Sequence, residues 1–117
     1  MSGIESFYSF ISEDYQGVLA RFGNGSVVER FVKKYYSDTT FERLSSAFAT
    51  SDVKSAFIYA HTLKGIAQNL GFGEFGRVAS ELTEILRKGS FDGTKELFEK
   101  VENCQKKVVE GIEKYLK

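Results

Sequence analysis

Proline and tryptophan are absent from this sequence of 117 residues, and cysteine and histidine occur once each. Without proline, nothing forces long helices to break, so glycine becomes the expected stop signal. The single cysteine, Cys104, cannot form an intramolecular disulfide, which argues against a disulfide-stapled secreted scaffold and favours a reducing, cytoplasmic compartment. On the apolar stripe of the last predicted helix it is expected to be a small buried hydrophobe. A lone histidine argues against a zinc site, and no metal or other cofactor is expected.

Neither sign of charge is in excess, because 16 basic residues balance 16 acidic ones. Non-specific nucleic-acid binders usually have a marked basic excess, so nucleic acid is not an expected partner. No apolar run approaches the roughly 20 residues needed to span a bilayer, and residues 1–11 lack the basic start of a signal peptide. Hydrophobic residues make up 42% of the chain. We therefore predict one domain over residues 1–117, with its own core and no membrane contact.

Apolar residues recur every three or four positions along most of the chain, which is the spacing of amphipathic helices, and no strand-like alternation is found. Six helices are predicted: Ile4–Phe22, one after Ser26, one after Thr39, one from Ser51 or Asp52 to Leu70, Glu74–Lys88, and one from Thr94 to the end.

Ser26 with Glu29, and Thr39 with Glu42, have the spacing of capping boxes. The two helices that they begin are separated by few residues and could be one kinked helix. Short connections make successive helices pack antiparallel. The predicted fold is all-α: an antiparallel up-and-down four-helix bundle with additional N-terminal helices that close one end or side.

The only histidine lies on the segment from residue 53 to residue 70, which has one continuous apolar face. At 100° per residue, His61 points away from that face and toward solvent. The apolar residues on the other half of the wheel are Ala56, Tyr59, Ala60, Leu63, Ile66, Ala67 and Leu70.

The neighbours of His61 on the helix wheel suit a reactive imidazole. Gly65 lies one turn away and costs the helix about 1 kcal/mol relative to alanine. A need for room beside His61 for an incoming active site would explain this cost. The Lys64 ammonium could offset the charge of a phosphoryl group on His61, and Gln68 could donate a further hydrogen bond. A neutral imidazole is a competent nucleophile near pH 7.

Three further residues on this helix suit a docking surface. Phe57 and Ile58 place apolar surface one turn before His61, although the N-terminal helix could cover them instead. Lys54 lies on the same stripe two turns before His61. It could contact a partner or be an ordinary solvated lysine, and the sequence favours neither interpretation.

The segment from Ala60 to Gly71, AHTLKGIAQNLG, resembles the signature of histidine-containing phosphotransfer domains. That signature has a histidine, then lysine three later, glycine four later, a small residue six later and glycine ten later. All five positions match, and only Ile66 departs slightly, where the family often has a small residue. The resemblance covers about residues 27–89, and the first and last helices match only in helical character.

The resemblance implies that His61 is phosphorylated on Nε2, that Lys64 and Gln68 assist, and that Gly65 gives access. It implies a phosphorelay intermediate in two-component signal transduction. Its partners would be receiver domains of response regulators or hybrid histidine kinases, and the receiver would hold Mg²⁺ and exchange the phosphoryl group through its aspartate. Stand-alone members of this family are phosphocarriers without a nucleotide site or autonomous kinase activity.

Two other readings of the function stay open. The bundle could dock a receiver domain or a partner helix without transferring anything, which an exposed Phe57 and Ile58 would permit. It could also be an enzyme with His61 as general base, although no second catalytic group is evident.

Residues 71–76 match G-x-G-x-x-G, but a nucleotide fingerprint needs a βαβ unit, so a glycine stop and tight turn are expected. Phe72 in this turn is predicted to touch a partner near His61.

Overall fold

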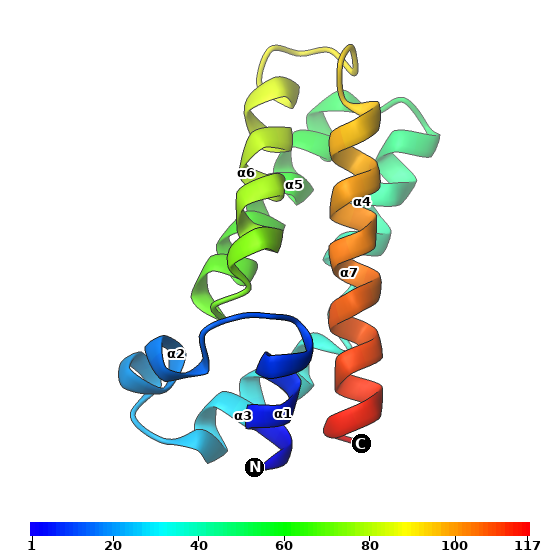
Figure 1. Cartoon of the computed structure of the whole chain (residues 1–117). Helices are drawn as coiled ribbons and strands as arrows, with labels where there is room; N and C mark the ends of the chain where they lie inside the picture. The colour runs from blue at the N-terminus through cyan, green and yellow to red at the C-terminus, as the bar shows by residue number, and fades with distance from the viewer.

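The computed structural model describes all of residues 1–117 and contains seven helices and no strand (Figure 1). The helices are α1 (Gly3–Phe10), α2 (Tyr15–Phe22), α3 (Gly25–Tyr35), α4 (Thr40–Ala49), α5 (Val53–Asn69), α6 (Gly73–Leu86) and α7 (Lys95–Tyr115). The all-α prediction is confirmed. No helix is both long enough and apolar enough to cross a bilayer.

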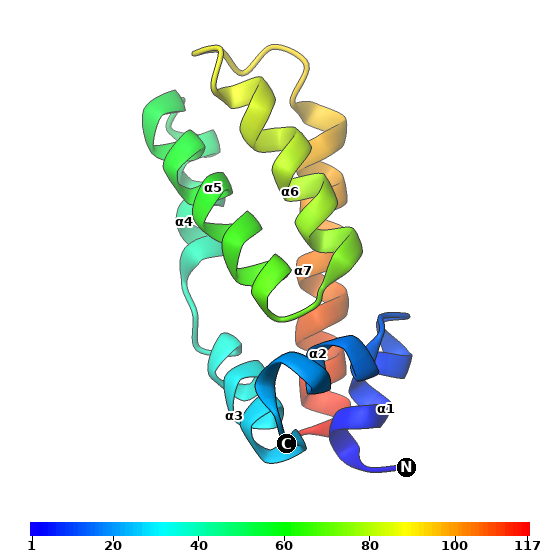
Figure 2. The same cartoon turned by 90° about the vertical axis from the view of Figure 1, so that its left-hand side faces the viewer.

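Helices α4, α5, α6 and α7 form the predicted antiparallel bundle (Figures 1 and 2). α5 packs against both α4 and α6, and α7 packs against α6. Short turns at residues 50–52 and 70–72 join the first three, so successive helices reverse direction. The 21-residue α7 is the longest helix, and its C-terminal half extends beyond the turn between α5 and α6.

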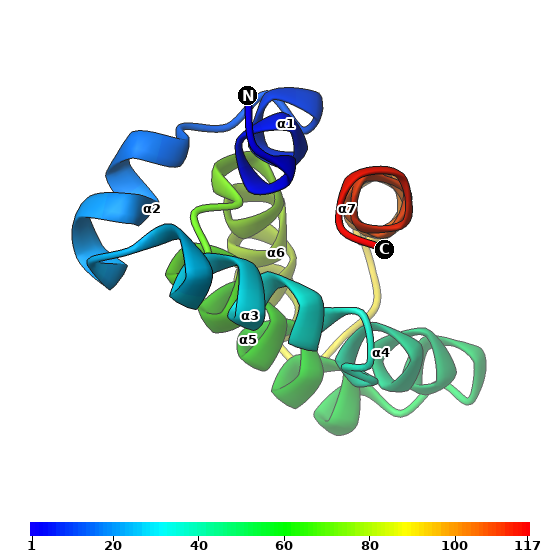
Figure 3. The same cartoon turned by 90° about the horizontal axis from the view of Figure 1, so that it is seen from below.

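Helices α1, α2 and α3 close the end of the bundle near the turn between α5 and α6, as seen from below in Figure 3. We call residues 3–35 the N-terminal cap. Phe7 and Tyr8 of the cap are fully buried. The Tyr8 hydroxyl donates a 2.6 Å hydrogen bond to the carbonyl oxygen of Leu70, at the end of α5. The cap therefore shares one core with the bundle.

The first predicted helix, Ile4–Phe22, is in fact two helices. The chain leaves α1 at Ile11, and Ser12 adopts a left-handed conformation with φ of +59°. Asp14 then begins α2, since its carboxylate accepts a hydrogen bond from the backbone N–H of Gln16. The prediction failed because Ile11 and Tyr15, which flank the break, keep the apolar spacing of an unbroken helix.

The starts of α3 and α4 also differ from the predicted capping boxes. Asn24 caps α3, with its side-chain oxygen accepting from the N–H of Val27 at 2.9 Å. Thr39 precedes α4 as predicted, but its side chain makes no capping bond. Asp38 instead accepts from the N–H of Thr40 at 2.8 Å. The residues between Tyr35 and Thr40 separate α3 from α4, so these are two helices rather than one kinked helix.

Candidate functional site

Helix α5 presents one face to the core and the opposite face to solvent. Its start is fixed by Asp52, whose carboxylate accepts from the backbone N–H of Ser55 at 3.1 Å and from its hydroxyl at 2.7 Å. On the inner face lie the buried side chains of Ala56, Ala60, Leu63 and Ala67. The predicted bounds of this helix agree with the structure to within one or two residues, because its cap and its apolar stripe give the same answer.

His61 is exposed near the middle of α5, as the helix wheel predicts. Neither ring nitrogen takes part in a hydrogen bond within the protein, so both are free to meet another molecule. The imidazole stacks on the Phe57 ring, with centroids 6.1 Å apart and an angle of 14° between the planes. The Thr62 hydroxyl points back along the helix and donates to the carbonyl oxygen of Ile58 at 2.9 Å.

Gly65 leaves open space one turn beyond His61. A Cβ atom built at Gly65 would have no heavy atom within 4 Å, apart from its own helix. The helical Gly76 differs, because a Cβ there would lie 3.0 Å from the Cγ of Gln68. Close helix packing therefore accounts for Gly76 but leaves Gly65 without a structural reason, which makes access to His61 the better explanation.

Lys64 and Gln68 flank the imidazole on the α6 side of α5. Lys64 is half-buried and forms no ion pair with a carboxylate. Hydrogen bonds from Arg87 lower the pKa of Glu84 on α6, and the nearby charges of Lys64 and His61 lower it further. Gln68 is exposed, and its Cγ lies against the backbone of Gly76. Both side chains therefore lie where they could approach a group on His61, and Lys64 is an unpaired cation.

The structure brings the three predicted docking residues of α5 into one groove of about 530 Å³. Ile58 is 56% exposed in this groove, so the N-terminal cap does not cover it. The groove is lined by Val53, Lys54, Phe57, Ile58, Leu86, Arg87 and Gly89.

Sequence reasoning missed the contribution of α6 to this groove. The Arg87 guanidinium lies over the Phe57 ring, 4.9 Å from its centroid, and its nitrogens bind the Glu84 carboxylate at 3.1 to 3.4 Å. The Phe57 ring thus lies beside both the His61 imidazole and the Arg87 guanidinium. The antiparallel hairpin gives a signal that could have found Arg87: a turn centred near Gly71 places residue 57 opposite residue 86.

The prediction that Phe72 touches a partner is wrong, because this side chain is 1% exposed. Its ring packs between the cap and the bundle, with centroids 5.9 Å from Phe7, 6.2 Å from Tyr8 and 6.0 Å from Tyr35. Phe72 follows the glycine turn that the N-terminal cap covers. The apolar ring is therefore used to join the two parts of the core, which the local motif could not reveal.

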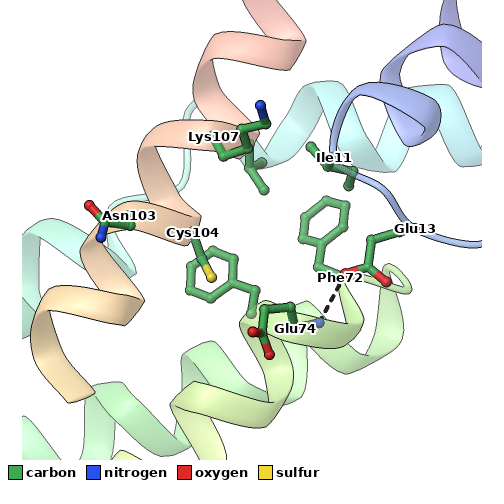
Figure 4. Close-up of a pocket in the computed structure, with 9 residues that line it drawn as sticks. Ile11, Glu13, Phe72, Glu74, Asn103, Cys104 and Lys107 are labelled. Atoms are coloured by element: carbon green, nitrogen blue, oxygen red, sulfur yellow. Dashed lines mark hydrogen bonds between the residues drawn. The ribbon is translucent and has the colours of Figure 1, made fainter. Parts of the chain in front are cut away.

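A second cavity, of about 280 Å³, lies away from His61 between the cap, α6 and α7 (Figure 4). Glu13 on its rim accepts a hydrogen bond from the N–H of Glu74 at 2.9 Å and so caps α6. Cys104 lines the cavity and is half-buried rather than fully buried. Burial raises the pKa of its thiol to about 11, so it is protonated at neutral pH. No three His, Cys, Asp or Glu side chains are grouped to hold a metal ion.

Comparison with protein families gives a match to the family model described as Hpt domain over residues 36–113, two thirds of the chain. The match takes in α4 to α6 and nearly all of α7, and so extends further toward the C-terminus than the motif itself indicated. It begins at residue 36, so the cap lies outside it. Comparisons with curated proteins and with solved structures find no match.

Proposed function

We propose a specific role for this chain, which belongs to the Hpt domain family: it is a phosphorelay intermediate that accepts a phosphoryl group on His61. Members of this family transfer phosphoryl groups in two-component signalling and are phosphocarriers rather than enzymes. The proposed donor and acceptor is an aspartate of a receiver domain. The observation that carries the proposal is an exposed imidazole, with both nitrogens free, beside an open glycine position.

The proposed step forms one bond and breaks one. The lone pair of Nε2 attacks the phosphorus of the receiver's aspartyl phosphate, and an N–P bond forms as the P–O bond to the carboxylate breaks. The carboxylate leaves with the bonding electrons, and the proton on Nδ1 stays on the ring or passes to water. In the reverse direction an aspartate attacks the phosphohistidine. Transfer of this kind depends mostly on position and on charge stabilisation.

Two side chains and one glycine on α5 support this chemistry. The Lys64 ammonium is one turn from His61 and offsets the charge of the phosphoryl oxygens, and Gln68 donates a hydrogen bond from the next turn. Gly65 leaves room for the receiver's aspartate to come within bonding distance. We expect the Mg²⁺ that supports the reaction on the receiver domain, which would supply oxygen ligands for it.

With one half-buried thiol and no disulfide, we propose that the chain works in the reducing environment of the cytoplasm.

The groove beside Phe57 and Ile58 supports docking close to the imidazole. It offers apolar surface, and Lys54 adds positive charge at its edge, where Arg87 is paired with Glu84. Apolar centres with polar rims are typical of protein interfaces. We propose that this groove receives apolar side chains of the receiver domain while its acidic site faces His61.

The test is phosphate exchange with a panel of phosphorylated receiver domains. We expect transfer of acid-labile, base-stable phosphate to the wild-type chain and none to His61→Gln. Because the chain has a single histidine, no other histidine can take over. Helical content and the unfolding temperature of His61→Gln should match the wild type. Labelling that persists in the variant would refute the role of His61, and binding without exchange would favour a docking module.

A further inference from the structure

We infer that Arg21 of the N-terminal cap is a positioning residue for phosphoryl transfer: it fixes the last turn of α5, and with it the Gln68 side chain on the His61 face. The inference rests on the proposed function, because it gives Gln68 a part in the transfer. It goes beyond that function, since Arg21 lies outside the family match and contacts α5 two turns beyond His61.

The C-terminal end of α5 has carbonyl oxygens that the helix itself cannot pair. The turn that follows pairs two of them. The backbone N–H of Phe72 donates to Ala67 at 2.8 Å, and that of Gly71 donates to Gln68 at 3.2 Å. With Gly71 in the left-handed conformation, this is a Schellman motif. No backbone N–H donates to the next two carbonyl oxygens along the chain.

Side chains of the N-terminal cap pair with these two oxygens. The Tyr8 hydroxyl donates to the carbonyl oxygen of Leu70 at 2.6 Å. A guanidinium nitrogen of Arg21 donates to that of Asn69 at 2.9 Å and lies 3.5 Å from that of Gln68. Figure 2 shows α2, which carries Arg21, below the end of α5. A cation is favourable there, because the C-terminal end of a helix carries partial negative charge.

The N-terminal cap also contacts the other side of this turn. The Glu13 carboxylate accepts a hydrogen bond from the backbone N–H of Glu74 at 2.9 Å, which holds the start of α6. The turn itself lies against the cap, since a Cβ atom at Gly71 would collide with the Val18 side chain. The cap therefore fixes the end of α5 and the start of α6 together, at one spacing.

The position of the Gln68 side chain depends on that spacing. Gln68 is seven residues beyond His61, and at 100° per residue this returns it to within 20° of the same face of α5. Its stem lies against Gly76 of α6, where a Cβ atom would be 3.0 Å from the Gln68 Cγ. A shift of the end of α5 relative to α6 would therefore displace this side chain. Displacements of about 1 Å in a positioned group can cost a hundredfold in rate.

The test is a double-mutant cycle of Arg21→Met and Gln68→Ala, with the transfer rate from a phosphorylated receiver measured at saturation by rapid quenching. Methionine keeps an unbranched stem and removes the guanidinium donors. We expect Arg21→Met to lower the rate about threefold and Gln68→Ala to lower it about tenfold, since the latter loses a hydrogen bond to a charged group. Adding Arg21→Met to Gln68→Ala should not lower the rate further, because Arg21 acts through Gln68.

Two variants serve as controls. Arg21→Lys retains a charged donor and should restore the rate to within about twofold of wild type. Arg30→Met makes the matched change at another exposed arginine of the cap, which contacts the Phe31 ring rather than α5, and it should transfer at the wild-type rate. The receiver Kd, measured by calorimetric titration, should be unchanged in Arg21→Met.

A nuclear magnetic resonance measurement on the chain alone checks the positioning without a receiver. The nuclear Overhauser effect between the Gln68 Hγ and Gly76 Hα protons should weaken in Arg21→Met and stay unchanged in Arg30→Met. An unchanged signal in Arg21→Met would overturn the inference.

The remaining outcomes separate this inference from the proposed function. A wild-type transfer rate in Arg21→Met, or an equal loss with and without Gln68→Ala, would overturn the inference and leave His61 as the phosphorylated residue. A raised Kd with a wild-type rate at saturation would assign Arg21 to docking and also overturn it. No transfer to the wild-type chain, with the Overhauser effect still lost in Arg21→Met, would refute the proposed function and leave the positioning of Gln68 by Arg21 standing.

Discussion

Replacing Gly65 by alanine should stabilise the fold while it impairs transfer, and this combination is a sharp test of the site. Gly65 is exposed inside α5, and a Cβ atom there meets no other heavy atom within 4 Å. Alanine therefore adds no clash, and it removes the backbone entropy that glycine costs a helix. The gain in the free energy of unfolding should be about 1 kcal/mol.

The expected gain converts into a measurable rise in unfolding temperature. An entropy of unfolding of about 2.1 cal/mol/K per residue gives roughly 0.25 kcal/mol/K for a chain of this length. One kcal/mol then corresponds to a rise of about 4 °C. Thermal unfolding followed by circular dichroism at 222 nm measures this directly in Gly65→Ala.

The same methyl group should slow phosphoryl transfer. It would occupy the space beside His61 through which we propose that the receiver's aspartate approaches, and displacement of reacting atoms by about 1 Å can cost a hundredfold in rate. We expect the transfer rate at saturating receiver to fall at least tenfold. Radiolabel transfer from a phosphorylated receiver, sampled by rapid quenching, gives this rate.

Gly71→Ala provides the control for the unfolding measurement. Gly71 has φ of +73°, and a Cβ there would collide with the side chain of Val18, so this variant should unfold at a lower temperature. A wild-type transfer rate in Gly65→Ala would refute the access role of Gly65. A lowered unfolding temperature would refute the claim that nothing in the fold requires this glycine.

Three further predictions follow from the same contacts. Phe57→Leu should lower the transfer rate at saturation about two- to fourfold, because losing the stacked ring frees His61 χ1 between the two wells that a helix allows and χ2 between two. Phe57→Tyr should restore the rate, and equal rates in all three proteins would argue against positioning. Tyr8→Phe should cost about 1 to 2 kcal/mol in urea unfolding, because the buried hydroxyl bonds the Leu70 carbonyl; an unchanged midpoint contradicts this. Iodoacetamide should alkylate Cys104 about a hundredfold more slowly than a free thiol at pH 8, because raising the pKa from 9.0 to about 11 leaves only about one thiol in a thousand ionised. The alkylation rate should rise about tenfold per pH unit up to about pH 10. Rapid labelling at pH 8 would count against the burial of this thiol.

The parts of the fold that could be predicted are those where two local signals agree. α5 has an aspartate cap, an apolar face and a glycine turn, and its predicted bounds are close to those observed. The break between α1 and α2 has only one signal, the polar run at residues 12–14, while Ile11 and Tyr15 continue the apolar spacing across it. Ser12 adopts its left-handed conformation in this turn, and the spacing of apolar residues does not indicate it.

The parts of the site that could not be predicted depend on contacts between distant segments. The exposure of His61 follows from the helix wheel of one segment. Arg21 reaching the end of α5, and Phe72 turning into the core, both depend on where the N-terminal cap docks. No periodicity within a single helix contains that information.

The two ends of α5 have different neighbours, which explains how one helix could serve both reaction and recognition. At its start, Phe57 and Ile58 meet Arg87 of α6 in an apolar groove with cations at its edge. At its end, the cap adds further cations and an exposed ring. Between them lies Gly65, where the surface is low because a side chain is missing. A receiver domain that docks in the groove at the start of α5 would thus lie next to this open position, from which we propose that its aspartate approaches the exposed imidazole.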